Sequence, residues 1–239
     1  MQENWIRHKE VTLHYIDSNP DCKNSAPLII SPGLSESAEN YTALMDSLLP
    51  KRCITLSHRG RGKSSAPEQG YTLEHHIADI EAVVDYFQLK NFYLMGYSRG
   101  VSYALGYAVK HSASLKGLIL AEYPPEHKKM PDGWADQYLT THWGNDLGAD
   151  IMEEQVVKAI EQESEYVNFR PHLYSIKCPV LIMRGVLNES LLTKEQAEGY
   201  EDAWKECWIE VFEKSGHTLK ESEEEKFAAA LKLFLNKNE

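Results

Sequence analysis

The stretch Gly96-Tyr97-Ser98-Arg99-Gly100 decides the fold expected for this chain of 239 residues. An apolar run, Asn91–Met95, precedes it and a helical run, Val101–Lys110, follows it. When a strand turns this sharply into a helix, the serine takes a strained backbone conformation, and the flanking glycines let neighbouring chains approach closely. The turn projects the Ser98 hydroxyl above the edge of a sheet, with a helix N-terminus behind it that favours negative charge. We therefore expect Ser98 to be a nucleophile.

Apolar runs alternate with helical segments on both sides of this turn. Most of the runs are rich in Ile, Leu, Val and aromatic residues, which is typical of strands buried on both faces. They are Val11–Ile16, Pro27–Ser31, Arg52–Ser57, Asn91–Gly96, Lys116–Ala121, Pro179–Arg184 and Cys207–Phe212. The alternation predicts an α/β protein with a mostly parallel central sheet and helices on both faces.

Three of the expected helices carry clear sequence signals. Thr72 can cap a helix whose apolar residues between Ile77 and Phe87 share one face. The tetrapeptide Thr193-Lys194-Glu195-Gln196 is a capping box that opens another helix. The last helix is expected from about Glu221, with an apolar stripe.

Residues 123–175 break the alternation. The segment contains prolines near both ends, helical patches around Asp150–Gln162 and no strong strand. At about 50 residues it exceeds the usual length of a crossover between strands. We therefore expect a core formed by residues 1–122 and 176–239, with a small helical cap of residues 123–175 inserted after the sixth strand. The aromatic residues Trp134, Tyr138 and Trp143 are expected to line an apolar substrate pocket over Ser98.

A serine nucleophile needs a base, and His217 is the best placed of the ten histidines. Ser215-Gly216-His217-Thr218 follows the last expected strand and precedes the closing helix. A loop there reaches the same carboxyl edge of the sheet as Ser98. His75 and His76 fall inside a helix and are expected to be partly solvated. No His-x-x-x-His or similar ligand spacing occurs, so a metal site is not expected.

Acyl chemistry also needs donors for an oxyanion. Ser31-Pro32-Gly33-Leu34 ends an expected strand where the chain must turn over the site. The backbone N–H groups of Leu34 and of Arg99, the residue after the nucleophile, are the two candidates.

The turn His58-Arg59-Gly60-Arg61-Gly62-Lys63-Ser64 ends in Gly-Lys-Ser, which suggests a phosphate-binding loop. That motif needs a glycine five residues before Gly62, and the residue there is Ser57. We therefore interpret it as a glycine-rich turn in which Arg59 ties loops together.

Composition and charge exclude several classes of function. The chain is 42% hydrophobic and 26% charged, which is typical of a globular protein. Its net charge of −11 disfavours nucleic acids and anionic membrane surfaces as partners. The N-terminus lacks the basic and apolar regions of a signal peptide, and no apolar run is long enough to span a bilayer. The four cysteines are scattered, so idle thiols in a reducing cytoplasm are expected.

Taken together, these motifs resemble the α/β-hydrolase superfamily over nearly the whole chain. The matching pieces are the Pro32–Leu34 loop, the Arg59–Ser64 turn, the Gly96–Gly100 elbow, a cap, and Gly216-His217. Members usually carry His-Gly in the first loop and Asp before the Arg-Gly of the second. Pro32 and His58 stand in those places here, and neither change removes a catalytic atom.

The resemblance leaves two positions for the acid that partners His217. After the seventh strand, where members most often have Asp, this chain has Asn188, which carries no charge, followed by Glu189. After the sixth strand, Glu122 stands at the end of an apolar run, where a charge is costly unless it has a partner. Some members use a Glu there. We favour Glu122 and keep Glu189 as the alternative.

The resemblance therefore implies a cytoplasmic serine hydrolase that acts on a small carboxylic ester or similar acyl substrate through an acyl-enzyme. No metal or organic cofactor is implied. Cleavage of C–C or lactone bonds, or perhydrolysis, by the same triad remains an alternative, as does a slow-turnover protein that binds a ligand for signalling.

Overall fold

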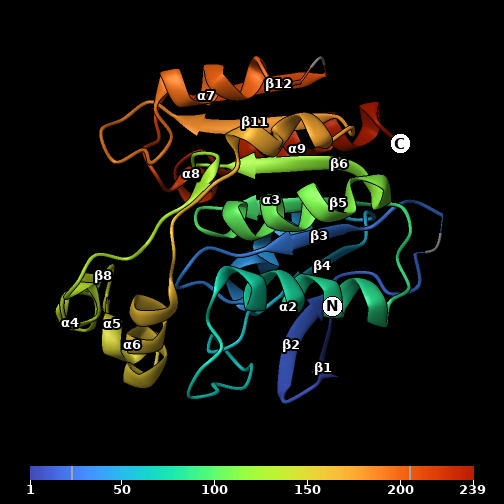
Figure 1. The fold of residues 1–239 in the computed structure, drawn as a ribbon. Coiled ribbons are helices and arrows are strands. Elements are labelled where there is room, and N and C mark those ends of the chain that lie inside the picture. The colour runs from blue at the N-terminus through green and yellow to red at the C-terminus, as the bar shows by residue number, and fades with distance from the viewer. Residues whose placement is uncertain (23, 205) are drawn as a thin grey trace.

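The computed structural model describes residues 1–22, 24–204 and 206–239, and an eight-stranded sheet lies at its centre (Figure 1). The strand order is β1-β2-β4-β3-β5-β6-β11-β12. The strands of this sheet are β1 (Gln2–His8), β2 (Val11–Asp17), β3 (Leu28–Ser31), β4 (Cys53–Leu56), β5 (Phe92–Tyr97), β6 (Leu115–Ala121), β11 (Val180–Gly185) and β12 (Cys207–Phe212). Strand β2 pairs antiparallel with both β1 and β4, and the remaining neighbours pair in parallel. The predicted α/β class with a mostly parallel sheet is confirmed.

Helices cover both faces of the sheet (Figure 1). One apolar cluster packs α2 (Leu73–Tyr86), α3 (Gly100–His111) and α7 (Lys194–Glu201) against the first face. A second cluster packs α1 (Thr42–Ser47) and α9 (Glu224–Lys237) against the other. The central strands are apolar throughout because both of their faces are buried in this way. The short elements outside residues 123–175 are η1 (Ala38–Tyr41), η2 (Ser112–Ser114) and α8 (Leu219–Ser222).

The predicted helix starts agree with the structure at α2 and α7. The Thr72 side chain accepts a hydrogen bond from the His75 amide, and Thr193 and Gln196 form the expected capping box. The last helix begins at Glu224 rather than near Glu221, because the non-helical backbone of Glu223 separates it from the short helix α8.

Strand β1 was not expected from the sequence. Five of its seven residues are exposed, and Ile6 is the buried one. A strand at the edge of a sheet that buries so little carries almost no alternating apolar pattern.

The segment of residues 123–175 contains helices and short strand pairs. Its elements are β7 (Glu126–His127), α4 (Trp134–Thr140), β8 (His142–Trp143), β9 (Asp146–Leu147), α5 (Gly148–Ile151), α6 (Glu154–Glu163), β10 (Val167–Asn168) and η3 (Arg170–Ser175). Strands β7 and β10 pair with each other, as do β8 and β9, and each is two residues long. Helices α4, α5 and α6 lie beyond the carboxyl ends of β6 and β11 (Figure 1). Their apolar cluster includes Tyr71 and borders Leu34 of the core.

None of the described helices is long and apolar enough to cross a membrane.

Candidate active site

Ser98 lies on the sharp turn between β5 and α3. Its backbone is left-handed, with φ of +51°, a conformation that a non-glycine residue rarely adopts. A Cβ atom on Gly96 would lie 2.6 Å from the Gly100 oxygen, and one on Gly100 would lie 2.3 Å from the Ser31 oxygen. No larger residue fits either position, so the two glycines and the strained serine form the elbow that the sequence predicted.

His217 lies in the loop after β12, and Tyr97 ties this loop to the elbow. The Tyr97 hydroxyl donates a hydrogen bond to the His217 carbonyl oxygen over 2.5 Å and accepts one from the Leu219 amide over 2.9 Å. Because Tyr97 directly precedes Ser98, these two hydrogen bonds tie the loop of the expected base to the elbow. The sequence did not identify Tyr97, since a tyrosine at the end of a buried strand is ordinarily part of the core.

Glu122 follows β6, and its carboxylate faces His217. Its side chain is fully buried, and its Oε2 lies 3.5 Å from Nδ1 of His217. Its backbone is also left-handed, with φ of +59°. Oε1 accepts hydrogen bonds from the Gly185 amide and the Ser190 hydroxyl, and Oε2 accepts one from the Leu191 amide. These three donors hold the carboxylate in one orientation.

Glu189, the alternative acid, is exposed. Its carboxylate lies against the backbone of Gly216, where a Cβ would come within 2.7 Å of Oε2. Within the described part of the chain, Glu189 forms no ion pair with His217. Of the two carboxylates, the structure brings Glu122 to the histidine ring.

The two expected oxyanion donors lie on either side of Ser98. Gly33 packs so closely that a Cβ on it would lie 3.2 Å from the serine Cβ, which places the Leu34 loop beside the nucleophile. Among the described residues, neither the Leu34 nor the Arg99 amide donates a hydrogen bond to a protein acceptor. Both N–H groups are therefore free to bind a substrate oxygen.

The three aromatic residues expected in the pocket have neighbouring rings within residues 123–175. Tyr138 is buried, and its ring centroid lies 5.2 Å from that of Trp134 and 5.5 Å from that of Trp143. Trp143 is 50% exposed. The hydroxyl of Tyr138 is buried without a hydrogen-bond partner.

The glycine-rich turn is organised by Arg59, as expected. The Arg59 guanidinium pairs with buried Asp79 at 2.6 Å and donates to the Gly70 carbonyl oxygen. His58 contacts the same carboxylate at 3.4 Å and Ser31 at 2.9 Å. The hydrogen bonds and charge of His58 and Arg59 lower the pKa of Asp79 despite its burial, which by itself raises the pKa.

The expectation that His76 is partly solvated was wrong. Its side chain is buried and stacks on Tyr103 at a centroid distance of 4.3 Å. It accepts a hydrogen bond from Arg61 and lies 2.8 Å from the Thr72 carbonyl oxygen. Burial lowers its pKa well below the ordinary value, so it is neutral. Helical position alone could not show this, because Arg61 and Tyr103 come from other parts of the chain.

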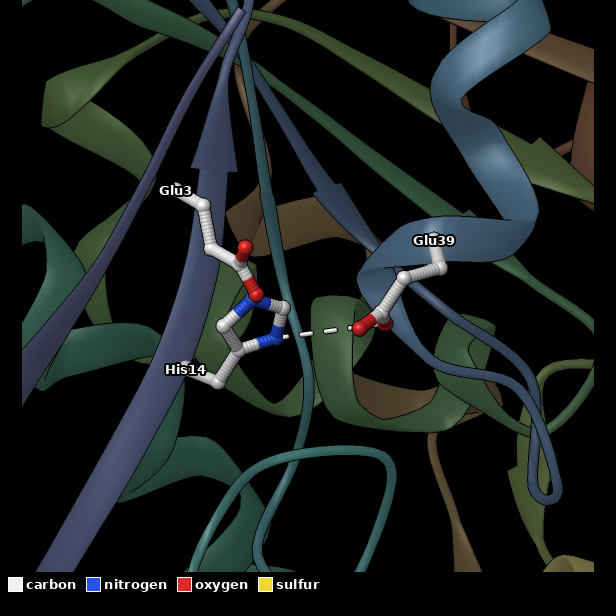
Figure 2. A group of neighbouring side chains, drawn as sticks. All are labelled: Glu3, His14 and Glu39. Atoms are coloured by element: carbon white, nitrogen blue, oxygen red, sulfur yellow. Dashed lines mark ion pairs between the residues drawn. The ribbon is translucent and has the colours of Figure 1, made fainter.

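A second cluster lies away from the elbow, on β1, β2 and η1 (Figure 2). Glu3, His14 and Glu39 offer ligand atoms within 4.8 Å of one another. Such groups can bind a metal ion, but the ammonium of Lys63 forms ion pairs with both glutamates. The chain's own lysine therefore already neutralises part of the charge of the two carboxylates.

Comparison with known proteins gives a consistent result. The family model for the alpha/beta hydrolase fold matches residues 26–141. A relative named AB hydrolase superfamily protein YisY, from Bacillus subtilis, is 26% identical over 97% of this chain and 98% of its own. Several further curated relatives align with about half of this chain and with less than half of their own length.

Solved structures share the fold at low identity. An esterase from Exiguobacterium antarcticum superposes with a TM-score of 0.80 at 22% identity, over 98% of this chain and 100% of that one. An enol-lactonase from Burkholderia xenovorans superposes with a TM-score of 0.81 at 18% identity, also over 98% and 100%. These likenesses extend over the whole chain, including the segment of residues 123–175.

Proposed function

Because the chain belongs to the α/β-hydrolase superfamily, we propose that it is a serine hydrolase of a small carboxylic ester or a related acyl substrate. The predicted superfamily and the broad class of hydrolase are confirmed. The triad, the substrate and the role of the cap are our proposals.

The proposed reaction has two steps. His217 takes the proton of the Ser98 hydroxyl while the serine oxygen attacks the ester carbonyl, and the protonated His217 then gives this proton to the departing alcohol, which leaves an acyl-enzyme. In the second step, neutral His217 takes a proton from water while the water oxygen attacks the acyl carbonyl, and it returns that proton to the Ser98 oxygen as the acid is released. The Leu34 and Arg99 amides bind the oxyanion in both steps, and Glu122 holds His217 in the tautomer that can accept a proton.

One observation carries this proposal: Glu122 faces His217, and the loop of His217 is tied by Tyr97 to the elbow on which Ser98 has a left-handed backbone. The backbone strain at Ser98 and the complete burial of the Glu122 side chain both lower the stability of the folded protein. Costly features at one place are expected where the geometry serves a reaction rather than packing alone.

Residues 123–175 are proposed to be a cap that shapes the substrate pocket. Their helices lie over the carboxyl ends of the strands, where ligands of open α/β sheets bind. A cytoplasmic location is proposed as well, and the free thiols of Cys22, Cys53 and Cys178 support it.

A fluorophosphonate tests the proposal directly, because it reacts only with a serine activated by a base. We expect one modified site, found at Ser98 by peptide mass spectrometry. Ser98→Ala should abolish modification, whereas Ser114→Ala, in η2 directly after α3, should not change it. Modification that persists in a folded Ser98→Ala protein would contradict the assignment. If Ser98 is modified and the unmodified enzyme hydrolyses lactones but not nitrophenyl esters, the lactonase alternative is favoured.

A further inference from the structure

The interior beside the elbow contains more buried positive charge than negative charge. Arg59, Arg61 and Arg99 are 5%, 2% and 3% exposed. Arg59 is paired with Asp79. Within the described part of the chain, no carboxylate oxygen lies within 4.0 Å of Arg61 or Arg99. A buried guanidinium without a counter-ion is destabilising, so these two need an explanation.

Arg61 is held only by neutral groups. Its Nε donates to the Leu34 carbonyl oxygen over 2.9 Å, and its Nη1 donates to the Arg59 carbonyl oxygen and to Nε2 of His76. Its Nη2 is buried and has no hydrogen-bond partner. The side chain is therefore fixed in place with two N–H bonds unused.

Arg99 is held in a similar way on the other side of the elbow. Its Nη2 donates to Nε2 of His127 over 3.0 Å, and Nδ1 of that ring lies 2.8 Å from the Ser102 hydroxyl. Because Nε2 accepts, His127 is neutral, and burial together with the charge of Arg99 lowers its pKa to about 2. The Met130 sulfur, a weak acceptor, lies 3.8 Å from Nη1, and Nε has no partner.

Two tyrosine hydroxyls add to this set of unused donors. Those of Tyr103 and Tyr138 are buried without a hydrogen-bond partner. Tyr103 stacks on His76, which holds Arg61, and Tyr138 comes from helix α4 of the cap segment. In the described part of the chain, seven buried side-chain nitrogen or oxygen atoms have no hydrogen-bond partner. Four of them are the donors of Arg61, Arg99, Tyr103 and Tyr138. A cluster of donors that lacks acceptors is complementary to an anion.

This donor cluster adjoins the reacting groups. Arg99 directly follows Ser98, and Arg61 holds the carbonyl oxygen of Leu34, whose amide is a proposed oxyanion donor. The cluster also contrasts with the net charge of −11 of the chain, so it is not part of a generally basic surface.

We propose that Arg61 and Arg99 bind a carboxylate on the acyl part of the substrate. This inference rests on the acyl chemistry proposed for Ser98. The enzyme would then cleave half-esters of small dicarboxylic acids in preference to neutral esters. A carboxylate is planar and offers two oxygens, which matches the donor geometry of guanidinium groups, and Tyr103 and Tyr138 can supply further hydrogen bonds.

A matched pair of substrates tests the preference. Mono-4-nitrophenyl glutarate carries the carboxylate, and methyl 4-nitrophenyl glutarate carries a neutral ester in its place. The succinate and adipate pairs vary the reach. We expect kcat/KM for the acid to exceed that for its methyl ester by about 10- to 100-fold in at least one pair, as hydrogen bonds to a charged group imply. A ratio of one or less in all three pairs overturns the proposal.

Variants of the arginines locate the effect. Arg61→Gln and Arg99→Gln should each lower the ratio by at least about 10-fold. The ratio is measured within one protein sample, so a loss of folded protein cancels. Arg59→Lys is the matched control, because Arg59 already has a carboxylate partner, and it should leave the ratio unchanged. An equal fall in the ratio for Arg59→Lys would overturn the assignment to Arg61 and Arg99.

A binding measurement separates this proposal from the proposed function. Ser98→Ala protein is titrated by calorimetry with glutarate, with neutral glutaramide and with inorganic phosphate. Glutarate binding that is lost in the Ser98→Ala, Arg61→Gln double variant supports the site even if no ester is hydrolysed. Absence of glutarate binding, or equal binding of glutaramide, refutes it, and binding of phosphate alone refutes the choice of a carboxylate.

Discussion

Replacing Glu122 by glutamine tests the role of the buried acid. Oε1 of Glu122 accepts hydrogen bonds from Gly185 and Ser190, and Oε2 accepts one from Leu191 and faces His217. A glutamine has almost the same shape. If its oxygen stays at the Oε1 position, two donors keep their acceptor and an NH₂ group replaces Oε2.

That NH₂ group faces Nδ1 of His217 as a donor. Nδ1 must then accept, which places the ring proton on Nε2, where it prevents the histidine from taking the proton of Ser98. In the serine protease triad, the same replacement of acid by amide lowers kcat about 10⁴-fold, or about 5.5 kcal/mol of activation free energy. The lost hydrogen bond from Leu191 should lower the free energy of unfolding by about 1–3 kcal/mol.

The assay compares kcat/KM for 4-nitrophenyl butyrate, with urea unfolding to establish that each variant is folded. Glu122→Gln should lose about 10³- to 10⁴-fold. Glu189→Gln is the matched control, because it removes the same charge from an exposed side chain near Gly216, and it should lose less than about threefold.

Two results would refute this reasoning. If the losses are reversed, the acid is Glu189, in the loop after β11. If folded Glu122→Gln retains activity within tenfold of the parent, His217 works without the help of this carboxylate.

Two further predictions concern the cap segment. Trp143 is half exposed and its ring contacts that of Tyr138, so Trp143→Ala should change the ratio of kcat/KM between short and long acyl esters. Tyr166→Ala, at an exposed aromatic outside this group, should leave the ratio unchanged. Equal losses for all esters would contradict a role of Trp143 in substrate choice. The pKa of His127 is about 2 in the folded protein, whereas the unfolded chain binds the proton below about pH 6.5, so stability is complete above pH 6.5 and falls as the pH decreases. From pH 7.5 to pH 5.5, the free energy of unfolding, measured with urea, should therefore fall by about 1.4 kcal/mol less in His127→Gln than in the parent. An equal fall in the two proteins would show that His127 is not buried in its neutral form.

The central fold was predictable because its signals are local. Six of the seven expected strands are almost entirely buried, and β12, at the edge of the sheet, is partly buried, so apolar runs mark them all. All seven are present within two residues of their expected ends. Strand β1 was missed because Ile6 is its one buried residue, and a single buried residue gives no alternating apolar pattern in the sequence. Its place in the sheet comes from its pairing with β2, which follows directly in the chain.

The candidate site was predictable in part for the same reason. The elbow is a local motif, and Glu122 is conspicuous as a charge at the end of an apolar strand. The three donors that hold its carboxylate could not be predicted, since they come from β11 and the loop that follows it, 63–69 residues further along the chain. Arg61 lies in a turn that a sequence pattern shows as exposed, and its burial depends on His76 and Leu34.

The two proposals are linked through the groups that hold the oxyanion. Arg99 supplies both a proposed oxyanion amide and one unpaired guanidinium, and Arg61 is bonded to the carbonyl oxygen of Leu34, whose amide is the other donor. A carboxylate bound between the guanidiniums would therefore restrain both amides at once. Binding energy used in this way acts on the transition state as well as on the substrate. The preference for a half-ester should consequently be expressed in kcat and not only in KM, which separates the proposed site from simple electrostatic attraction of the substrate to the pocket.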